Sequence, residues 1–380
     1  MNEIQKPMTV DSKPPTSERL VSLDIFRGLV MFLLVAETAG IYHAVTDLTV
    51  PGTFWNQLIT QFHHHPWHGL RFWDLIQPFF MFIVGVAMAF SVAKRTTHGF
   101  TWNQSLRHIL FRCFMLLLFG VGLHCIYAGA LRWGLWNVLS QLSVTILIAF
   151  LIMRWSAFTQ IAISFALLVA TEIAYRTYAS IAGIDDPFVQ GTNFGARLDM
   201  ILMGKINSGG WVAINCIPTA AHTIWGVVAG QLLLSERSPV RKMGWLLLAG
   251  LVLLLAGYAL DLFDVTPIIK RICTSSFVLV SGGWCLVVLA SFYGLADVAG
   301  WRRWGFLFVV VGMNPIFIYL FSETIGRQWL NRTVAIFTTG GLEMAGVSAA
   351  VASVFTALVV FTLQWYLCYW LYRHKILIKI

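Results

Sequence analysis

Long apolar runs separated by short polar turns recur along the chain from Leu20 onward. A helix that crosses the hydrocarbon core needs about 20 mainly apolar residues, which most of these runs supply. Lipid offers no partner for free backbone groups, so the runs are expected to be helices. The pattern predicts an all-α, polytopic integral membrane helix bundle with about ten transmembrane helices. The spans are expected near residues 22–44, 73–93, 105–128, 135–153, 157–176, 212–234, 242–261, 271–295, 305–322 and 346–371.

The composition supports one membrane domain and argues against a soluble one. Hydrophobic residues make up 58% of the chain and charged residues 11%, whereas a typical soluble domain carries roughly 25% charged residues. We therefore expect a single transmembrane domain over residues 21–380. The polar residues 1–20, with Pro7, Pro14 and Pro15, are expected to form a disordered cytoplasmic tail.

Basic residues set the expected orientation. An even number of spans puts both termini on one side, and Lys and Arg concentrate in cytoplasmic segments of membrane proteins. Placing both termini in the cytoplasm puts most of the 26 Lys and Arg residues on that side. The net charge of +9 then needs no nucleic-acid partner. Two longer loops, at 45–72 and 177–211, are expected outside.

The first outer loop contains a histidine cluster, His63-His64-His65-Pro66-Trp67-His68. Imidazole titrates near neutrality, which favours a general base or a nucleophile among His63, His64 and His65. A merely solvated loop is the alternative. A metal site needs three or four suitably placed ligands, and Pro66 prevents a simple helical pair of histidines. The six cysteines are scattered without a CxxC pair, so neither a metal nor a disulfide framework is expected.

Carboxylates inside the predicted spans are functional candidates, because a charge at membrane depth is costly. Asp24 and Arg27 share one face of the first span and form either a structural ion pair or part of a site. Glu37 lies roughly 15 Å beyond Arg27, toward the histidine loop. Asp74 opens the second span, where it could cap the helix, orient a histidine through Nδ1, or do both.

Four motifs resemble those of the heparan-α-glucosaminide N-acetyltransferase family and its bacterial relatives. The chain has Arg19-Leu-Val-Ser-Leu-Asp24-Ile-Phe-Arg27-Gly28, and His64-His-Pro-Trp67-His68-Gly69 followed by Asp74-Leu-Ile-Gln-Pro78-Phe-Phe-Met-Phe-Ile-Val-Gly85. It also has Lys270-Arg-Ile-Cys-Thr-Ser275-Ser276-Phe-Val-Leu and Gly312-Met-Asn314-Pro315-Ile. The similarity runs from about residue 19 to 322 in the same order.

The resemblance implies a transmembrane acetyltransferase. The family moves acetyl groups from cytoplasmic acetyl-CoA to an amino sugar on the far side of the membrane. Its reactive histidine falls on His64, which would act as a base or carry the acetyl group, with Asp74 or Glu37 holding its tautomer. Glu37 places the chain nearer the bacterial branch, which implies the bacterial cytoplasmic (inner) membrane.

The remaining expected roles divide between the two substrates. Trp67, His68 and Arg71 would bind the sugar, and acetyl-CoA would bind at Asp24, Arg27, Ser275, Ser276 and Asn314. Lys270 and Arg271 belong to a family motif, but the predicted topology puts them outside. The acceptor, a one-step or two-step transfer, and assembly as a monomer or homodimer stay open.

Two other function classes compete with the enzyme. A proton-coupled transporter of a small anion or sugar would use the charges in the spans, but no internal repeat is visible. A non-catalytic scaffold would not need those charges. Activity in detergent distinguishes the acetyltransferase from the transporter, because transport requires a sealed membrane.

Overall fold

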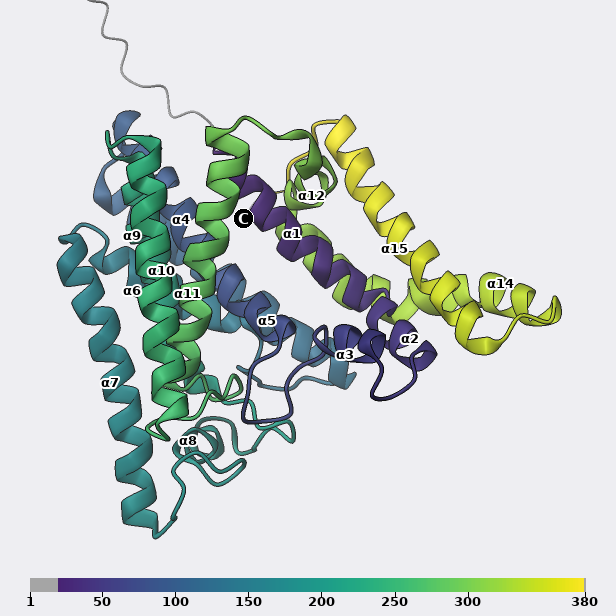
Figure 1. Cartoon of the computed structure of the whole chain (residues 1–380), viewed down its shortest axis with the longest axis horizontal. Coiled ribbons are helices and arrows are strands. Elements are labelled where there is room, and N and C mark those ends of the chain that lie inside the picture. The colour runs from purple at the N-terminus through teal and green to yellow at the C-terminus, as the bar shows by residue number, and fades with distance from the viewer. Residues whose placement is uncertain (1–19, 379–380) are drawn as a thin grey trace, which may run out of the picture.

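The computed structural model describes residues 20–378, and within this range every regular element is a helix (Figure 1). The predicted tail falls almost wholly outside the described residues. The all-α prediction is confirmed. The bounds of the helices are α1 (Val21–Thr38), α2 (Ile41–Leu48), α3 (Phe54–Thr60), η1 (Phe72–Leu75), α4 (Ile76–Thr97), α5 (Trp102–Ala128), α6 (Val138–Ile152), α7 (Ala157–Ala182), α8 (Phe194–Met203), η2 (Ala213–Asn215), α9 (Cys216–Leu234), α10 (Pro239–Leu262), α11 (Ser275–Phe292), η3 (Tyr293–Val298), η4 (Arg303–Gly305), α12 (Phe306–Gly312), α13 (Pro315–Phe321), η5 (Ser322–Leu330), α14 (Asn331–Met344) and α15 (Ala349–Arg373).

Seven helices in the described range are long and apolar enough to cross a membrane, or up to nine if each of two bent pairs is one span. Helices α1 and α2 meet at 61° around Gly40, whose φ of 88° suits glycine. The second pair bends by 66° at Asn314–Pro315, where proline interrupts the backbone hydrogen bonding. Helix α6 has only 15 residues. The predicted count of ten spans therefore stays a prediction.

Helices α4 and α9 form the centre of the bundle because small residues let their backbones approach closely. A methyl group on Gly85 would lie 2.1 Å from the carbonyl oxygen of Thr223, and one on Gly226 2.2 Å from that of Phe82. Gly226 and Gly230 are four residues apart on α9, the spacing of small residues common where membrane helices pack. This contact fixes the position of α4, the helix that begins at the histidine loop.

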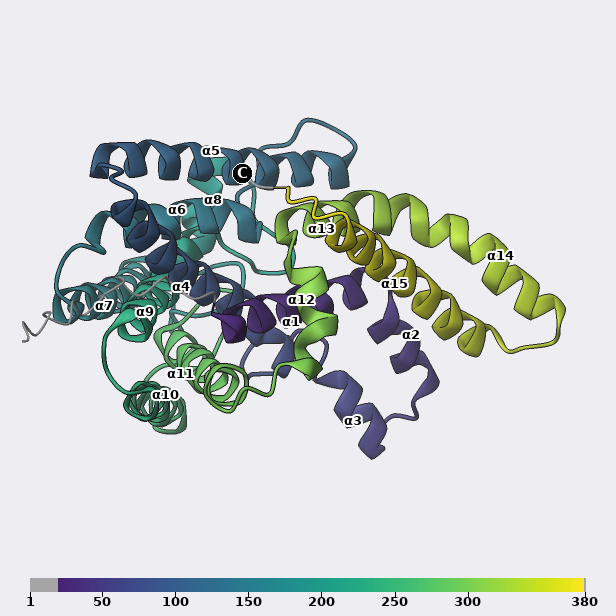
Figure 2. The same ribbon diagram turned by 90° about the horizontal axis from the view of Figure 1, so that it is seen from above.

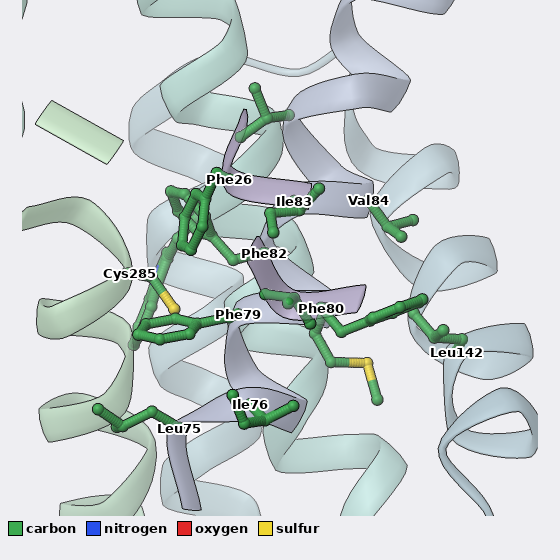
Figure 3. Packing of buried hydrophobic residues seen from close by; sticks show 14 of the residues in the cluster. Phe26, Leu75, Ile76, Phe79, Phe80, Phe82, Ile83, Val84, Leu142 and Cys285 are labelled. Atoms are coloured by element: carbon green, nitrogen blue, oxygen red, sulfur yellow. The ribbon is translucent and has the colours of Figure 1, made fainter. Parts of the chain in front are cut away.

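Aromatic side chains fill the space around α4 (Figure 3). Phe79, Phe80 and Phe82 are at most 9% exposed. The Phe26 ring of α1 packs edge-on against Phe79, with centroids 5.1 Å apart. Cys285 of α11 lies on one side of α4 and Leu142 of α6 on the other. Four helices thus hold α4 in a single position.

The outer helices differ from this core in the way expected of lipid-facing segments. In the most apolar 18-residue stretches of α7 and α10, only 17% of the residues are buried. In the corresponding stretch of η2 and α9, 72% are buried. Helices α14 and α15 form a hairpin that extends away from the bundle (Figures 1 and 2). The apolar exposed faces are consistent with a protein embedded in a bilayer.

The first and last sequence motifs pack against each other. A methyl group on Gly28 would lie 2.1 Å from the carbonyl oxygen of Phe308, so α1 and α12 touch at that point. Arg27 binds Asp24 at 2.7 Å and donates to the carbonyl oxygen of Gly312 at 2.9 Å. The predicted ion pair of the first span thus also joins it to α12.

Gly226→Ala should lower the thermal stability of the purified protein, because the new methyl group meets the backbone of α4 rather than a movable side chain. Overpacking of this kind typically costs about 1–3 kcal/mol. Gly244→Ala in α10 is the matched control, since no atom lies within 4 Å of its Cβ position. Equal melting temperatures for the two variants would contradict this account of the α4–α9 contact.

Candidate active site

The site is built around a histidine held by a buried carboxylate at the start of α4. His64 lies in the loop after α3, and its Nδ1 is 3.0 Å from Oδ1 of Asp74. Asp74 lies in η1, and its side chain is 1% exposed. If Nδ1 carries the hydrogen, it donates to Asp74, and Nε2 keeps a free lone pair. That is the arrangement of an imidazole prepared to act as base or nucleophile.

Backbone groups hold the Asp74 carboxylate in place. Its Oδ2 accepts hydrogen bonds from the backbone N–H groups of Arg71 at 2.9 Å and His65 at 3.2 Å. Arg71 in turn donates from Nη1 to the carbonyl oxygen of His64 at 2.9 Å. The carboxylate therefore caps the first helical turn and also contacts the imidazole, so the two positions considered for Asp74 from the sequence are compatible.

Lys270 completes the group from the loop between α10 and α11. Its Nζ lies 3.1 Å from Nδ1 of His64 and 3.7 Å from Oδ1 of Asp74. The two loops are joined, because Gly69 donates its N–H to the carbonyl oxygen of Ile268 at 2.8 Å. Lys270 thus lies on the same side of the protein as the histidine loop. From the sequence, Lys270 was recognised only as part of a motif, and no role at His64 was expected for it.

The surroundings keep the imidazole uncharged. Burial and then the Lys270 ammonium lower the pKa of His64 from its ordinary value of 6.5 to about 4, against the opposing effect of Asp74. Burial also lowers the pKa of Lys270 from 10.5 to about 8. Near neutral pH, His64 is therefore neutral beside an ammonium and a carboxylate that balance each other.

His64 and Lys270 line a cavity of about 390 Å³ that extends into the bundle. Trp73 and Trp211 flank the imidazole, with ring centroids 6.4 and 5.4 Å from its own. The cavity is large enough for a small-molecule site of the usual size. Its other lining residues come from α1, α4, α5, α6, α13 and η5 and from two loops: Leu34, Ile76, Gln77, Phe80, His124, Tyr127, Trp136, Asn137, Val138, Leu139, Gln141, Asn207, Tyr319, Glu323 and Arg327.

A second ionisable group of residues lies on the wall formed by α5 and η5. Glu323 Oε2 accepts hydrogen bonds from Tyr127 Oη at 2.7 Å and from Arg327 Nη1 at 3.2 Å. Arg327 Nη2 lies 3.0 Å from Oε1 of Glu37. The structure thus brings Asp74, and not Glu37, to His64. Sequence reasoning missed Glu323 and Arg327, because both lie in the polar segment Ser322–Leu330, just beyond the span predicted to end at residue 322.

The residues expected to bind a sugar lie around the cavity rather than in its wall. His68 Nε2 contacts Asp261 Oδ1 at 2.8 Å. Trp67 packs near Gly210, and Arg71 reaches only the backbone of His64. Of the neighbouring histidines, His63 contacts Thr46 Oγ1 at 2.8 Å, and neither it nor His65 lines the cavity.

The residues expected to bind acetyl-CoA fall into two separate places. Ser275 binds Glu172 at 3.2 Å, and Ser276 donates to the carbonyl oxygen of Pro267 at 2.7 Å, so both support the Lys270 loop. Asn314 lies beside the Asp24–Arg27 end of α1. Its side-chain amide bonds backbone groups of the C-terminal segment, at Ile376 and Ile378.

Among residues 20–378, no group of three or more His, Cys, Asp or Glu side chains is arranged to hold a metal ion. Asp74 faces His64 and Lys270, and His68 faces Asp261. The site as described therefore contains an imidazole, an ammonium and carboxylates, which suit acid–base and nucleophilic chemistry.

Comparison with known proteins relates the chain to one family of acetyltransferases. A family model described as "Heparan-alpha-glucosaminide N-acetyltransferase, catalytic" matches residues 19–255. The chain is 31% identical over 150 residues to a Mus musculus heparan-alpha-glucosaminide N-acetyltransferase, covering 37% of this chain and 20% of that protein. It is 24% identical over 397 aligned positions to the Homo sapiens protein of the same name, covering 85% and 57%. The chain thus spans less than two thirds of the length of either relative.

The matched range contains both the histidine loop and α4, and it covers well over half of the chain. The chain therefore belongs to the family of heparan-alpha-glucosaminide N-acetyltransferase catalytic domains.

Proposed function

We propose that this protein is a transmembrane acetyltransferase that takes an acetyl group from cytoplasmic acetyl-CoA and delivers it to an amino sugar on the other side. The observation that carries the proposal is an imidazole whose Nδ1 contacts a buried carboxylate, in the wall of a cavity inside a membrane bundle. The family to which the chain belongs supports acyl transfer in general.

The proposed chemistry assigns one role to each residue. With its hydrogen on Nδ1, His64 presents the Nε2 lone pair, which either attacks the thioester carbonyl or accepts a proton from the amine. Asp74 holds this tautomer and stabilises positive charge that forms on the ring. Burial, together with the Lys270 ammonium, keeps the resting ring uncharged, so the lone pair is available near neutral pH.

The charge distribution supports the proposed sidedness. Helix α4 begins at the histidine site and ends with Lys94 and Arg95 in its last turn. At the same end of the bundle, the turn between α9 and α10 carries Arg237, and α10 begins with Arg241 and Lys242. Basic residues favour the cytoplasm, so the histidine site is assigned to the opposite side. The chain is proposed to act in the bacterial inner membrane.

His64→Ala should abolish acetyl transfer by the purified protein in detergent, because it removes the Nε2 lone pair of the imidazole that Asp74 contacts. The measurement is labelled acetyl transferred from acetyl-CoA to a panel of amino sugars. His98→Ala, at the other end of α4, is the matched control and should keep full activity. A fully active His64→Ala protein would remove the central residue of the proposal. Uptake by sealed liposomes without turnover in detergent would instead favour the transporter.

The pH dependence should reveal the influence of Lys270 on His64. Because the pKa of His64 is about 4, the imidazole stays neutral as pH falls, and the acid limb of kcat/KM for acetyl-CoA should lie near that value. Lys270→Met removes the cation, so the pKa of His64 should rise and the acid limb should move toward pH 6.5. Lys270→Arg keeps the charge and should leave the limb in place. A lower rate with an unmoved limb in Lys270→Met would assign the lysine a structural role.

A further inference from the structure

The overall transfer leaves one proton that His64 does not account for. A protonated amine loses two hydrogens when it becomes an amide: one ends on the thiol of CoA, and the other must be accepted elsewhere. In a two-step transfer, His64 is itself acetylated when the amine arrives. In a one-step transfer, it accepts the proton that it then passes to the departing thiol, so it is not free to take the other. A carboxylate in the same cavity would provide an acceptor for this second proton.

We propose that Glu323 is this acceptor and that it binds the acceptor amine as a cation before it takes the proton. This inference rests on the proposed function. Glu323 is 7% exposed, and it lines the cavity together with His64. The step transfers a proton from R–NH3⁺ to the Glu323 carboxylate. The neutral amine then attacks the acetyl carbonyl carbon, and the bond from that carbon to sulfur, or to Nε2 of an acetylated His64, breaks.

The charges on the wall formed by α5 and η5 support a cation site. Glu37 and Glu323 both contact Arg327, at 3.0 and 3.2 Å, so two carboxylates share one guanidinium. Lys270, on the other part of the lining, is already balanced by Asp74, which contacts it at 3.7 Å. A buried charge is costly unless it is compensated. One carboxylate in excess is therefore suited to a cationic ligand, or to the proton that the ligand leaves behind.

An unpaired polar atom on the same wall points to a ligand independently. His124 lines the cavity, and its Nε2 is buried without a hydrogen-bond partner in the described part of the chain. Its ring lies 6.4 Å from that of Tyr127, which donates to Glu323. Buried polar groups in proteins nearly always have a partner. A polar acceptor molecule beside Glu323 would supply one.

Binding and transfer test this inference separately. Binding is measured by the thermal shift that glucosamine, with its amine, and N-acetylglucosamine, which is uncharged, produce in the full chain without acetyl-CoA. Glucosamine should raise the melting temperature of the wild type and of His64→Ala more than N-acetylglucosamine does. In Glu323→Gln the two sugars should have equal effects. Glu236→Gln is the matched control, because Glu236 is an exposed carboxylate just after the end of α9.

Transfer to glucosamine at pH 7 should fall roughly 100-fold or more in Glu323→Gln, as expected when a general base is lost. The rate should recover as pH rises and the free amine becomes abundant, and hydroxylamine, an amine uncharged at pH 7, should be acetylated at the wild-type rate. This pH profile separates a lost base from a misfolded variant, which no acceptor or pH would rescue.

Each outcome decides between the two proposals. Full transfer and an unchanged glucosamine preference in Glu323→Gln would overturn the role of Glu323 and leave the acetyltransferase intact. A glucosamine preference that depends on Glu323, in a protein that transfers no acetyl group, would keep the cation site and overturn the acetyltransferase. A Glu323→Gln defect in transfer that neither high pH nor hydroxylamine relieves would contradict the base role.

Discussion

The contact between His64 and Asp74 is the interaction on which the site depends. A carboxylate that is 1% exposed can stay ionised only if its surroundings compensate the charge. Two backbone N–H groups, the imidazole and Lys270 do so here. Each of these partners is thereby fixed in position. The close contact of α4 with α9 then holds Asp74 itself, since it lies in the turn that leads into α4.

The cavity joins the His64 group to a second group of charged residues, formed by Glu323 and Arg327. Lys270 comes from the loop before α11, whereas Glu323 and Arg327 come from η5, so distant parts of the chain meet around one space. The bends at Gly40 and Asn314 make this arrangement possible. They turn the ends of α1 and α12 aside and bring η5 alongside α1. Glu37 of α1 and Arg327 of η5 thus meet although they are 290 residues apart in the chain.

Sequence alone predicted the helical fold and pointed to His64 and Asp74, which the structure places in contact, because apolar length and charges near apolar runs are local signals. Asp74 was found from its place at the start of a span, and the histidine from its loop and a motif. The partner of Glu37 could not be found, since its 3.0 Å contact with Arg327 joins residues far apart in the chain. The residues expected to bind acetyl-CoA do not lie together either. Ser275 and Asn314 are in different parts of the fold, which the sequence order does not reveal.

The most direct test of the central claim is the position of the acetyl group in the bound protein. Cryo-electron microscopy with an acetyl-CoA analogue, in which a methylene group replaces the thioester sulfur, would locate it. The account predicts the acetyl carbonyl carbon in the cavity, roughly 3–3.5 Å from Nε2 of His64, the distance of reacting atoms. An acetyl group bound outside this cavity, with His64 free, would contradict it.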